Sequence, residues 1–508
     1  MRIKGPALAL ALVLPPVTAQ AQQPLSVIDW LNDNPVPDPP GYVLLEPPVA
    51  DSALRPDVDV SPLDTLLPPV GLVPAAITGL SANLWAGSDS DELIRLIAEV
   101  PVQRTPAMQT LLYTLLLSET RPPAGAEEAF LLARLDRLMA LGAVDPAQAL
   151  VQQAGPTRNA ARFQRWFDAT LLTGDEDQGC LALLAMPHLS SDYAARIFCT
   201  VRRGDWPTAA LTIESAHALD LLPPDKLDLL DRFLAPELFE GMPPLPVPED
   251  PDPLTFRLFE SIGEPLATAT LPPAFAAADL RDLAGWKAQL TAAERLARSG
   301  ALSPNMLLGL YTDRAPAASG GVWDRVAGLQ AFEKAMASGD AEAIAETLPE
   351  LWQRMVRANL EVPVATLFAA NLVEVPLDGD ATRSLLQRIA LLSPDYRALT
   401  RRVATDTPEG RFLDGLARGR PDLDLARSPV EQAIVEGFAP GFLLPADLTA
   451  EDGGAGLGAA ILRAMVLFER GSVGNLADLS TALAAFRAAG LEDTARRAAL
   501  QVLLLERG

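Results

Sequence analysis

Apolar side chains recur at the period of an α-helix through residues 88–508. The segment 89–100 is typical, because its large aliphatic residues from Leu93 to Val100 are spaced to lie on one helix face. No run of alternating β-branched residues is bounded by tight turns. Since an amphipathic helix must bury its apolar face against another element, we expect an all-α protein.

Gly-Asp pairs punctuate this pattern at 174–175, 204–205, 339–340 and 379–380. Glycine favours the left-handed conformation that ends a helix, and aspartate caps the next helix by accepting free backbone N–H groups. The pairs recur at intervals of thirty and forty residues, the length of a helical hairpin. This spacing predicts an α-solenoid of irregular hairpins, tetratricopeptide-like although no repeat carries the full tetratricopeptide pattern. A closed helical ring would show the same pattern.

Proline dominates the segment before the helices. Residues 22–74 hold twelve prolines and eight acidic residues, so we expect a Pro-rich, acidic, extended arm over 22–87. Apolar islands interrupt it at 25–31 and 41–45. The first island suits either a strap along the chain's own helices or a docking element for a partner, carried by Leu25, Val27, Ile28, Trp30 and Leu31.

A second proline-rich segment divides the helical region. Residues 236–253 contain seven prolines and five acidic residues. We therefore predict an N-terminal helical array over 88–235, a linker over 236–253 and a C-terminal array over 254–508. One continuous superhelix with a long rigid loop is the alternative.

The first 21 residues have the three parts of a secretory signal peptide. Arg2 and Lys4 supply the positive charge, 7–14 is an apolar run, and small residues precede a cleavage site after Ala21. No later segment is apolar for the roughly 18 residues that a spanning helix needs, so no transmembrane segment is expected in the mature chain. These features predict a periplasmic protein.

Charge and cysteine content narrow the possible partners. The formal net charge is −24, which would repel nucleic acid. Two cysteines, Cys180 and Cys199, fall on predicted neighbouring helices in a compartment that permits disulfides. They are either disulfide-bonded or two small buried apolar side chains, because spacing alone does not decide their geometry.

One loop has residue types suited to binding an anion. Arg314, Ser319, Gly320, Gly321 and Arg325 combine arginine forks with a glycine-rich approach to a helix. Ser319 is alternatively an N-cap of that helix.

No catalytic, cofactor-binding or metal-binding motif is recognised in the sequence. The tryptophans are scattered in helical patterns where core packing is expected: Trp166, Trp206, Trp286, Trp323 and Trp352. A carboxylate pair among them, as in glycan-cleaving helical proteins, is an open alternative.

The stretch 285–325, with the segments GWKAQL, AERLAR and PNMLLGLYTDRAPAASGGVWDR, resembles uncharacterised exported helical proteins of alphaproteobacteria. The resemblance extends over much of the helical region and the Trp-bearing apolar island near the N-terminus. It implies export and carries over no activity or site residue.

Together these features predict a periplasmic helical-repeat scaffold or adaptor that binds another envelope protein. The alternatives are a helical protein that binds or cleaves cell-wall glycan, and a structural subunit of an envelope machine for secretion or motility.

Overall fold

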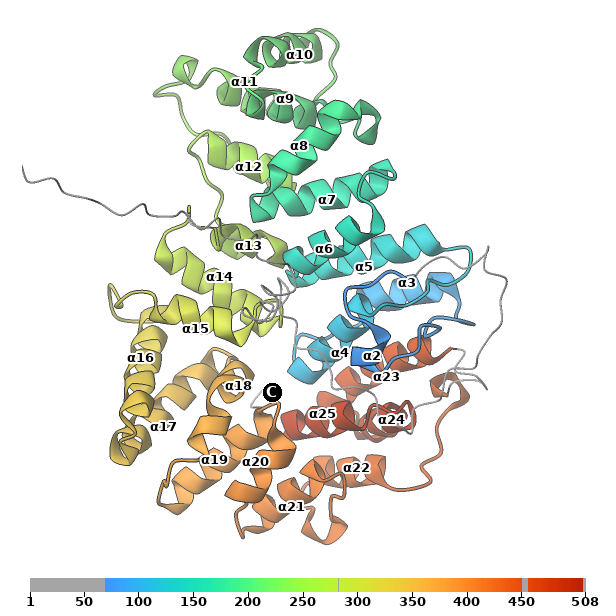
Figure 1. Ribbon diagram of the computed structural model, residues 1–508, viewed down its shortest axis with the longest axis vertical. Helices are drawn as coiled ribbons and strands as arrows, with labels where there is room; N and C mark the ends of the chain where they lie inside the picture. Colours follow the sequence, from blue (N-terminus) through green and yellow to red (C-terminus); the bar gives the residue numbers. More distant parts are fainter. Residues whose placement is uncertain (1–68, 282, 450–455, 506–508) are drawn as a thin grey trace, which may run out of the picture. The chain divides into compact units, whose positions relative to one another are not determined.

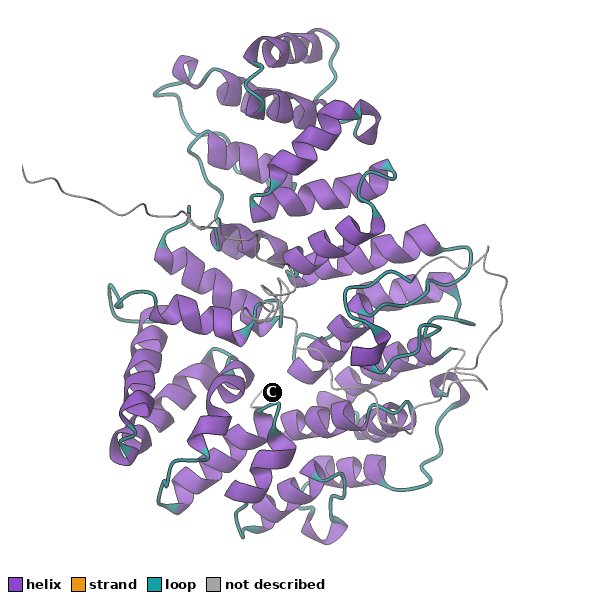
Figure 2. Cartoon of the chain, in the orientation of Figure 1, coloured by secondary structure: helices purple, strands orange, loops and turns teal. Residues whose placement is uncertain are grey.

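The computed structural model describes residues 69–281, 283–449 and 456–505 (Figure 1). Helices connected by loops make up this part of the chain, which contains no strand (Figure 2). Two isolated β-bridges, Val70 with Thr120 and Val73 with Ser118, are its only extended pairings. The predicted all-α fold is confirmed.

The α-helices of the described residues are, in chain order, α2 (Ala75–Thr78), α3 (Ser90–Glu99), α4 (Pro106–Leu117), α5 (Glu127–Leu141), α6 (Val144–Ala154), α7 (Ala160–Thr173), α8 (Glu176–Ala185), α9 (Tyr193–Arg202), α10 (Trp206–Ala218), α11 (Pro224–Leu234), α12 (Pro253–Ser261), α13 (Ala276–Asp279), α14 (Trp286–Arg298), α15 (Pro304–Thr312), α16 (Val322–Ser338), α17 (Ala341–Arg357), α18 (Glu361–Leu372), α19 (Asp380–Leu392), α20 (Tyr396–Val403), α21 (Pro408–Ala417), α22 (Pro429–Phe438), α23 (Leu457–Ser472), α24 (Leu476–Ala488) and α25 (Glu492–Leu504). Short 3₁₀ helices lie between them: η2 (Pro187–Leu189), η3 (Pro236–Leu238), η4 (Thr268–Thr270), η5 (Pro273–Phe275), η6 (Leu423–Leu425) and η7 (Ala446–Leu448).

The aspartate of the Gly-Asp pair is the N-cap residue at three of the four predicted places, and at two of these its side chain makes the capping hydrogen bond. Asp205 accepts the N–H of Thr208 at the start of α10, and Asp340 caps α17 in the same way. Asp175 is the N-cap residue of α8, but its carboxylate makes no capping hydrogen bond to that helix and accepts from the Gln148 side chain. The last pair also differs, since α19 begins at its aspartate and the preceding glycine is the N-cap.

Helical hairpins are the unit of packing. Consecutive helices such as α5 and α6, α16 and α17, and α23 and α24 pack against each other along the chain (Figure 1). The buried apolar side chains form one continuous cluster within a single compact unit. This arrangement confirms the solenoid-like architecture predicted from the sequence.

Helices near the two ends of the described array are in contact. Helix α3 packs against α23, and α4 packs against α25 (Figure 1). Arg463 of α23 donates to both carboxylate oxygens of Glu92, at 2.6 and 2.9 Å. The Gln501 side chain accepts the N–H of Ala107 at 2.8 Å. The helical array is therefore closed by contacts between its two ends.

The part of the predicted arm that the structure describes, residues 69–87, packs against the helices. Trp85 is fully buried, and its Nε1 donates to the Thr120 hydroxyl at 2.9 Å. Buried Arg134 donates to the carbonyl oxygens of Val70 and Leu116 at 2.9 and 2.7 Å. Burial without a carboxylate partner lowers the pKa of Arg134 to about 10. These contacts anchor residues 69–87 to the end of α4.

The proline-rich segment 236–253 lies between helices that contact one another. Helices α11 and α12, on either side of it, pack together. Farther back in the chain, Glu176 of α8 is paired with Arg257 of α12 at 2.8 Å, and Glu176 is almost fully buried. Contacts thus cross the segment, while the predicted division into two arrays stays a prediction.

Candidate binding cleft

A wide surface cleft of about 880 Å³ lies beside α14. Its walls are the loop 265–269, the first turns of α14, the loop 314–317 and the start of α16. Most of the lining is apolar, with alanines and two tryptophans. This volume and composition fall within the usual range for binding sites.

Two tryptophans line the cleft, and we call this aromatic part of the lining its floor. The rings of Trp286 and Trp323 have their centroids 5.1 Å apart, with the ring planes inclined by 53°. Trp286 is 8% exposed, and its Nε1 donates to the carbonyl oxygen of Leu310 at 3.0 Å. Trp323 is half-buried. Trp286 is therefore fixed by the core, and Trp323 presents more of its ring to the cleft.

The charged residues of the cleft are mostly cationic. Lys287 and Arg314 line it with their side chains exposed, and Asp279 is the carboxylate among its described lining residues. The Thr268 hydroxyl donates to Asp279. Burial raises the pKa of the Asp279 carboxyl, although Thr268 and then Arg281 act in the opposite direction. The cationic character contrasts with the chain as a whole, which has 65 acidic and 41 basic residues.

A buried polar network holds the helices behind the cleft. Glu294 of α14 is 1% exposed and accepts from Arg325 of α16 at 2.6 and 2.7 Å. The Tyr311 hydroxyl of α15 donates to the same carboxylate at 2.5 Å, and Arg298 donates to it at 3.2 Å. Burial, and then the charge of Glu294, raise the pKa of Tyr311. The network joins three helices and so fixes both ends of the loop between α15 and α16.

The predicted anion loop is only partly assembled. Arg325 is directed to Glu294, whereas Arg314 is paired with Asp313 at 2.8 Å. The N–H of Gly320 donates to the carboxylate of Asp324. Several donors assigned to an anion thus have protein partners, and of the predicted residues Arg314 alone lines the cleft. Anion binding by this loop stays a prediction.

Ser319 does not cap α16, so that interpretation was wrong. The helix begins at Val322, and its N-cap is Gly321 with a φ of 59°, a left-handed value that glycine tolerates. Ser319 is exposed. A serine two positions before the N-cap is too early to reach the first helical N–H groups.

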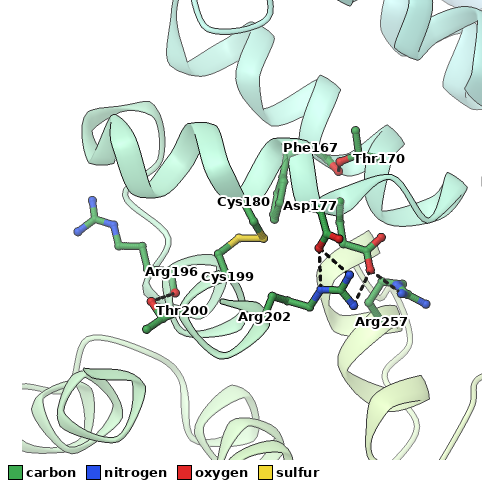
Figure 3. Close-up of a disulfide and its surroundings, with 10 residues drawn as sticks. Phe167, Thr170, Asp177, Cys180, Arg196, Cys199, Thr200, Arg202 and Arg257 are labelled. Carbon is green, nitrogen blue, oxygen red and sulfur yellow. Dashed lines mark hydrogen bonds and ion pairs between the residues drawn. A yellow bond between two sulfur atoms is a disulfide. The ribbon is translucent and has the colours of Figure 1, made fainter. Parts of the chain in front are cut away.

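The two cysteines are joined in a disulfide (Figure 3). Cys180 of α8 and Cys199 of α9 are both buried, and their Cα atoms are 4.9 Å apart. The bond crosslinks one helical hairpin beside Phe167 and beside the ion pair of Asp177 with Arg202 (Figure 3).

Large apolar side chains are exposed on the hairpins around this disulfide. Trp206 and Leu211 of α10 are 49% and 69% exposed, and Leu219, the residue after this helix, is 66% exposed. Leu181 and Leu184 of α8 line a smaller groove of about 560 Å³. The expectation of a core position was wrong for Trp206, because α10 buries only its small side chains and one isoleucine. It is right for Trp166, Trp286 and Trp352, which are buried.

The proposed docking element from Leu25 to Leu31 and the signal peptide lie outside the described residues. No helix among the described residues has both the length and the hydropathy to cross a bilayer. Within the same residues, no group of three or more His, Cys, Asp and Glu side chains could hold a metal.

Sequence reasoning missed how the cleft is assembled. It singled out the loop 304–325 but assigned Trp286 and Trp323 to the core separately, and it gave no role to Lys287 or to residues 265–269. The signal that could have joined them is the density of tryptophan, glycine and arginine within 285–325, the segment that carries the resemblance.

Comparison of the chain with models of known families, with curated proteins and with solved structures finds no match. The cleft and its surroundings are therefore interpreted from their own geometry.

Proposed function

We propose that this protein is an exported helical-repeat adaptor that binds another protein of the cell envelope. The observation that carries the proposal is the cleft beside α14, which combines an apolar floor containing Trp286 and Trp323 with exposed cationic side chains. Aromatic residues and arginine are enriched where proteins bind one another. Stacked helical hairpins are a common scaffold for such surfaces.

Two further features support this proposal. The exposed apolar side chains of α8 and α10 are of the kind that a partner covers. The buried disulfide between Cys180 and Cys199 is consistent with an oxidising compartment, as the predicted signal peptide requires.

A co-purification experiment tests the proposal. The full chain, tagged at its C-terminus, is expressed in the bacterium that encodes it and recovered from the periplasmic fraction after mild crosslinking. We expect a mature N-terminus at Gln22 and one envelope protein recovered at constant stoichiometry. Recovery of the chain alone, or of the uncleaved chain in the cytoplasm, would refute the proposal.

A second candidate is binding of cell-wall glycan, favoured by the tryptophan pair because sugars stack on aromatic rings. The cleft gives less support to glycan cleavage. Glycoside hydrolysis ordinarily uses two carboxylates on opposite sides of the bond, and Asp279 is the one carboxylate among the described lining residues. Titration with soluble cell-wall glycan fragments, followed by tryptophan fluorescence, tests this candidate.

A further inference from the structure

The cleft beside α14 presents three kinds of recognition group together. Its floor is apolar and aromatic, and Lys287 and Arg314 are exposed cations on its walls. The Arg314 side chain is paired with the exposed carboxylate of Asp313 at 2.8 Å. Such a surface pair contributes little energy, so a ligand carboxylate can replace it.

Some wall residues also have backbone N–H groups without a protein acceptor. Ala267, Ala315 and Ala317 belong to its walls, and within the described part of the chain their N–H groups donate no hydrogen bond. The N-terminus of α14, at Trp286 and Lys287, has no side-chain cap. Free backbone donors along an open groove pair with the carbonyl oxygens of an extended peptide, as in peptide recognition by main-chain hydrogen bonding.

The charged residues of the cleft restrict the sequence of the peptide further. Among the described residues that line the cleft, two are cationic and one is acidic, and the acidic one is occupied by Thr268. In a chain of net charge −24, Lys287 and Arg314 favour an anionic ligand at this cleft.

We propose that this cleft binds an extended segment of a partner protein in which a carboxylate stands next to a large apolar side chain. The apolar side chain packs on the tryptophan floor, and the carboxylate pairs with Lys287 and Arg314. The peptide main chain accepts from the N–H groups of the alanine-lined walls. This inference rests on the proposed adaptor function and specifies its partner.

The test uses a phage-displayed library of random peptides, selected against the immobilised full-length chain. We expect enriched sequences to place Asp or Glu beside Trp, Phe or Leu. Fluorescein-labelled copies of these peptides are then titrated and followed by anisotropy. The double variant Lys287→Glu/Arg314→Glu should lower their affinity about tenfold or more, since both changes reverse a charge facing the ligand.

Matched variants separate binding from folding. Lys334→Glu makes the same charge change at an exposed position on α16 that does not line the cleft, and it should bind the peptides like the parent chain. Ala317→Trp fills the cleft from an exposed position and should abolish binding without loss of helix content.

Several outcomes would overturn the inference. Enrichment of basic or neutral peptides, or equal affinity for the double variant and the parent, would remove the assigned charge role. If no peptide is enriched and cell-wall glycan fragments change the tryptophan fluorescence, the cleft is a sugar site. If the double variant still co-purifies with the envelope partner, the adaptor function stands and the assignment of the cleft fails. If the parent chain co-purifies with none, the adaptor function itself fails.

Discussion

Replacing Glu294 by Ala should destabilise the protein by about 4 kcal/mol. Glu294 is 1% exposed, and its carboxylate is the shared acceptor of Arg325 and Tyr311. Breaking a buried ion pair costs about 3–5 kcal/mol, and the lower end applies because the Arg325 side chain is 20% exposed. The buried Tyr311 hydroxyl, left without its acceptor, adds about 1 kcal/mol.

Equilibrium urea denaturation, followed by far-UV circular dichroism, measures this loss. Glu294→Gln should cost less, about 2 kcal/mol, because its amide oxygen still accepts one hydrogen bond while the charge is removed. Arg314→Ala is the control, since it removes the exposed pair with Asp313 and should change stability by less than about 1 kcal/mol. A loss below about 2 kcal/mol for Glu294→Ala, or equal losses for all three variants, would refute the reasoning.

Three further predictions concern the closure of the array, pH and the disulfide. Gly458→Ala should destabilise by about 1–3 kcal/mol in urea, because the new Cβ would lie 2.4 Å from the buried tryptophan ring it faces. Gly309→Ala, with nothing within 4 Å, should be neutral or stabilising by up to about 1 kcal/mol. Burial raises the pKa of Asp168 to about 7, so the folded state retains a proton that the unfolded state releases from about pH 4 upward. The free energy of unfolding should therefore fall as pH rises from about 4 to about 7. Asp168→Asn should flatten this fall and stabilise the protein at pH 8 by roughly 1–3 kcal/mol. A pH profile of urea midpoints that is the same for the variant and the parent would contradict this. Replacing Cys180 and Cys199 by serine should cost about 3 kcal/mol, measured against the oxidised parent, and a loss of under about 1 kcal/mol would contradict a stabilising crosslink.

The local parts of the fold could be predicted because their causes are local. Helical periodicity and the capping aspartates Asp205 and Asp340 act within a few residues, and each produces the expected boundary. Asp175 also lies at the expected boundary, as the N-cap residue of α8, but its carboxylate accepts from Gln148 and not from the helix, which the neighbouring sequence does not reveal. The prediction that Ser319 is an N-cap was wrong because the two glycines after it allow α16 to start later, at Val322.

Contacts between distant segments could not be predicted from the sequence. Glu92 and Arg463 are 371 residues apart, and neither has a neighbouring residue that identifies its partner. The cleft is likewise built from separate segments, since residues 265–269 line it together with the first turns of α14 and the loop 314–317. The pairing of the two cysteines could not be decided from the sequence for the same reason, because their spacing sets no distance between two helices. The prediction of an anion-binding loop did not include Glu294, which pairs with Arg325 of that loop.

Site-specific photocrosslinking in the living bacterium tests the central claim most directly. A photoreactive phenylalanine analogue replaces Ala317 at the cleft or Ala331, which is exposed on α16 away from it. We predict that the chain, processed to begin at Gln22, forms an adduct with one envelope protein from Ala317 and none from Ala331. The adduct should be lost in the Lys287→Glu/Arg314→Glu background. An unprocessed cytoplasmic chain, or the same adducts from both positions, would contradict an exported adaptor that binds its partner through this cleft.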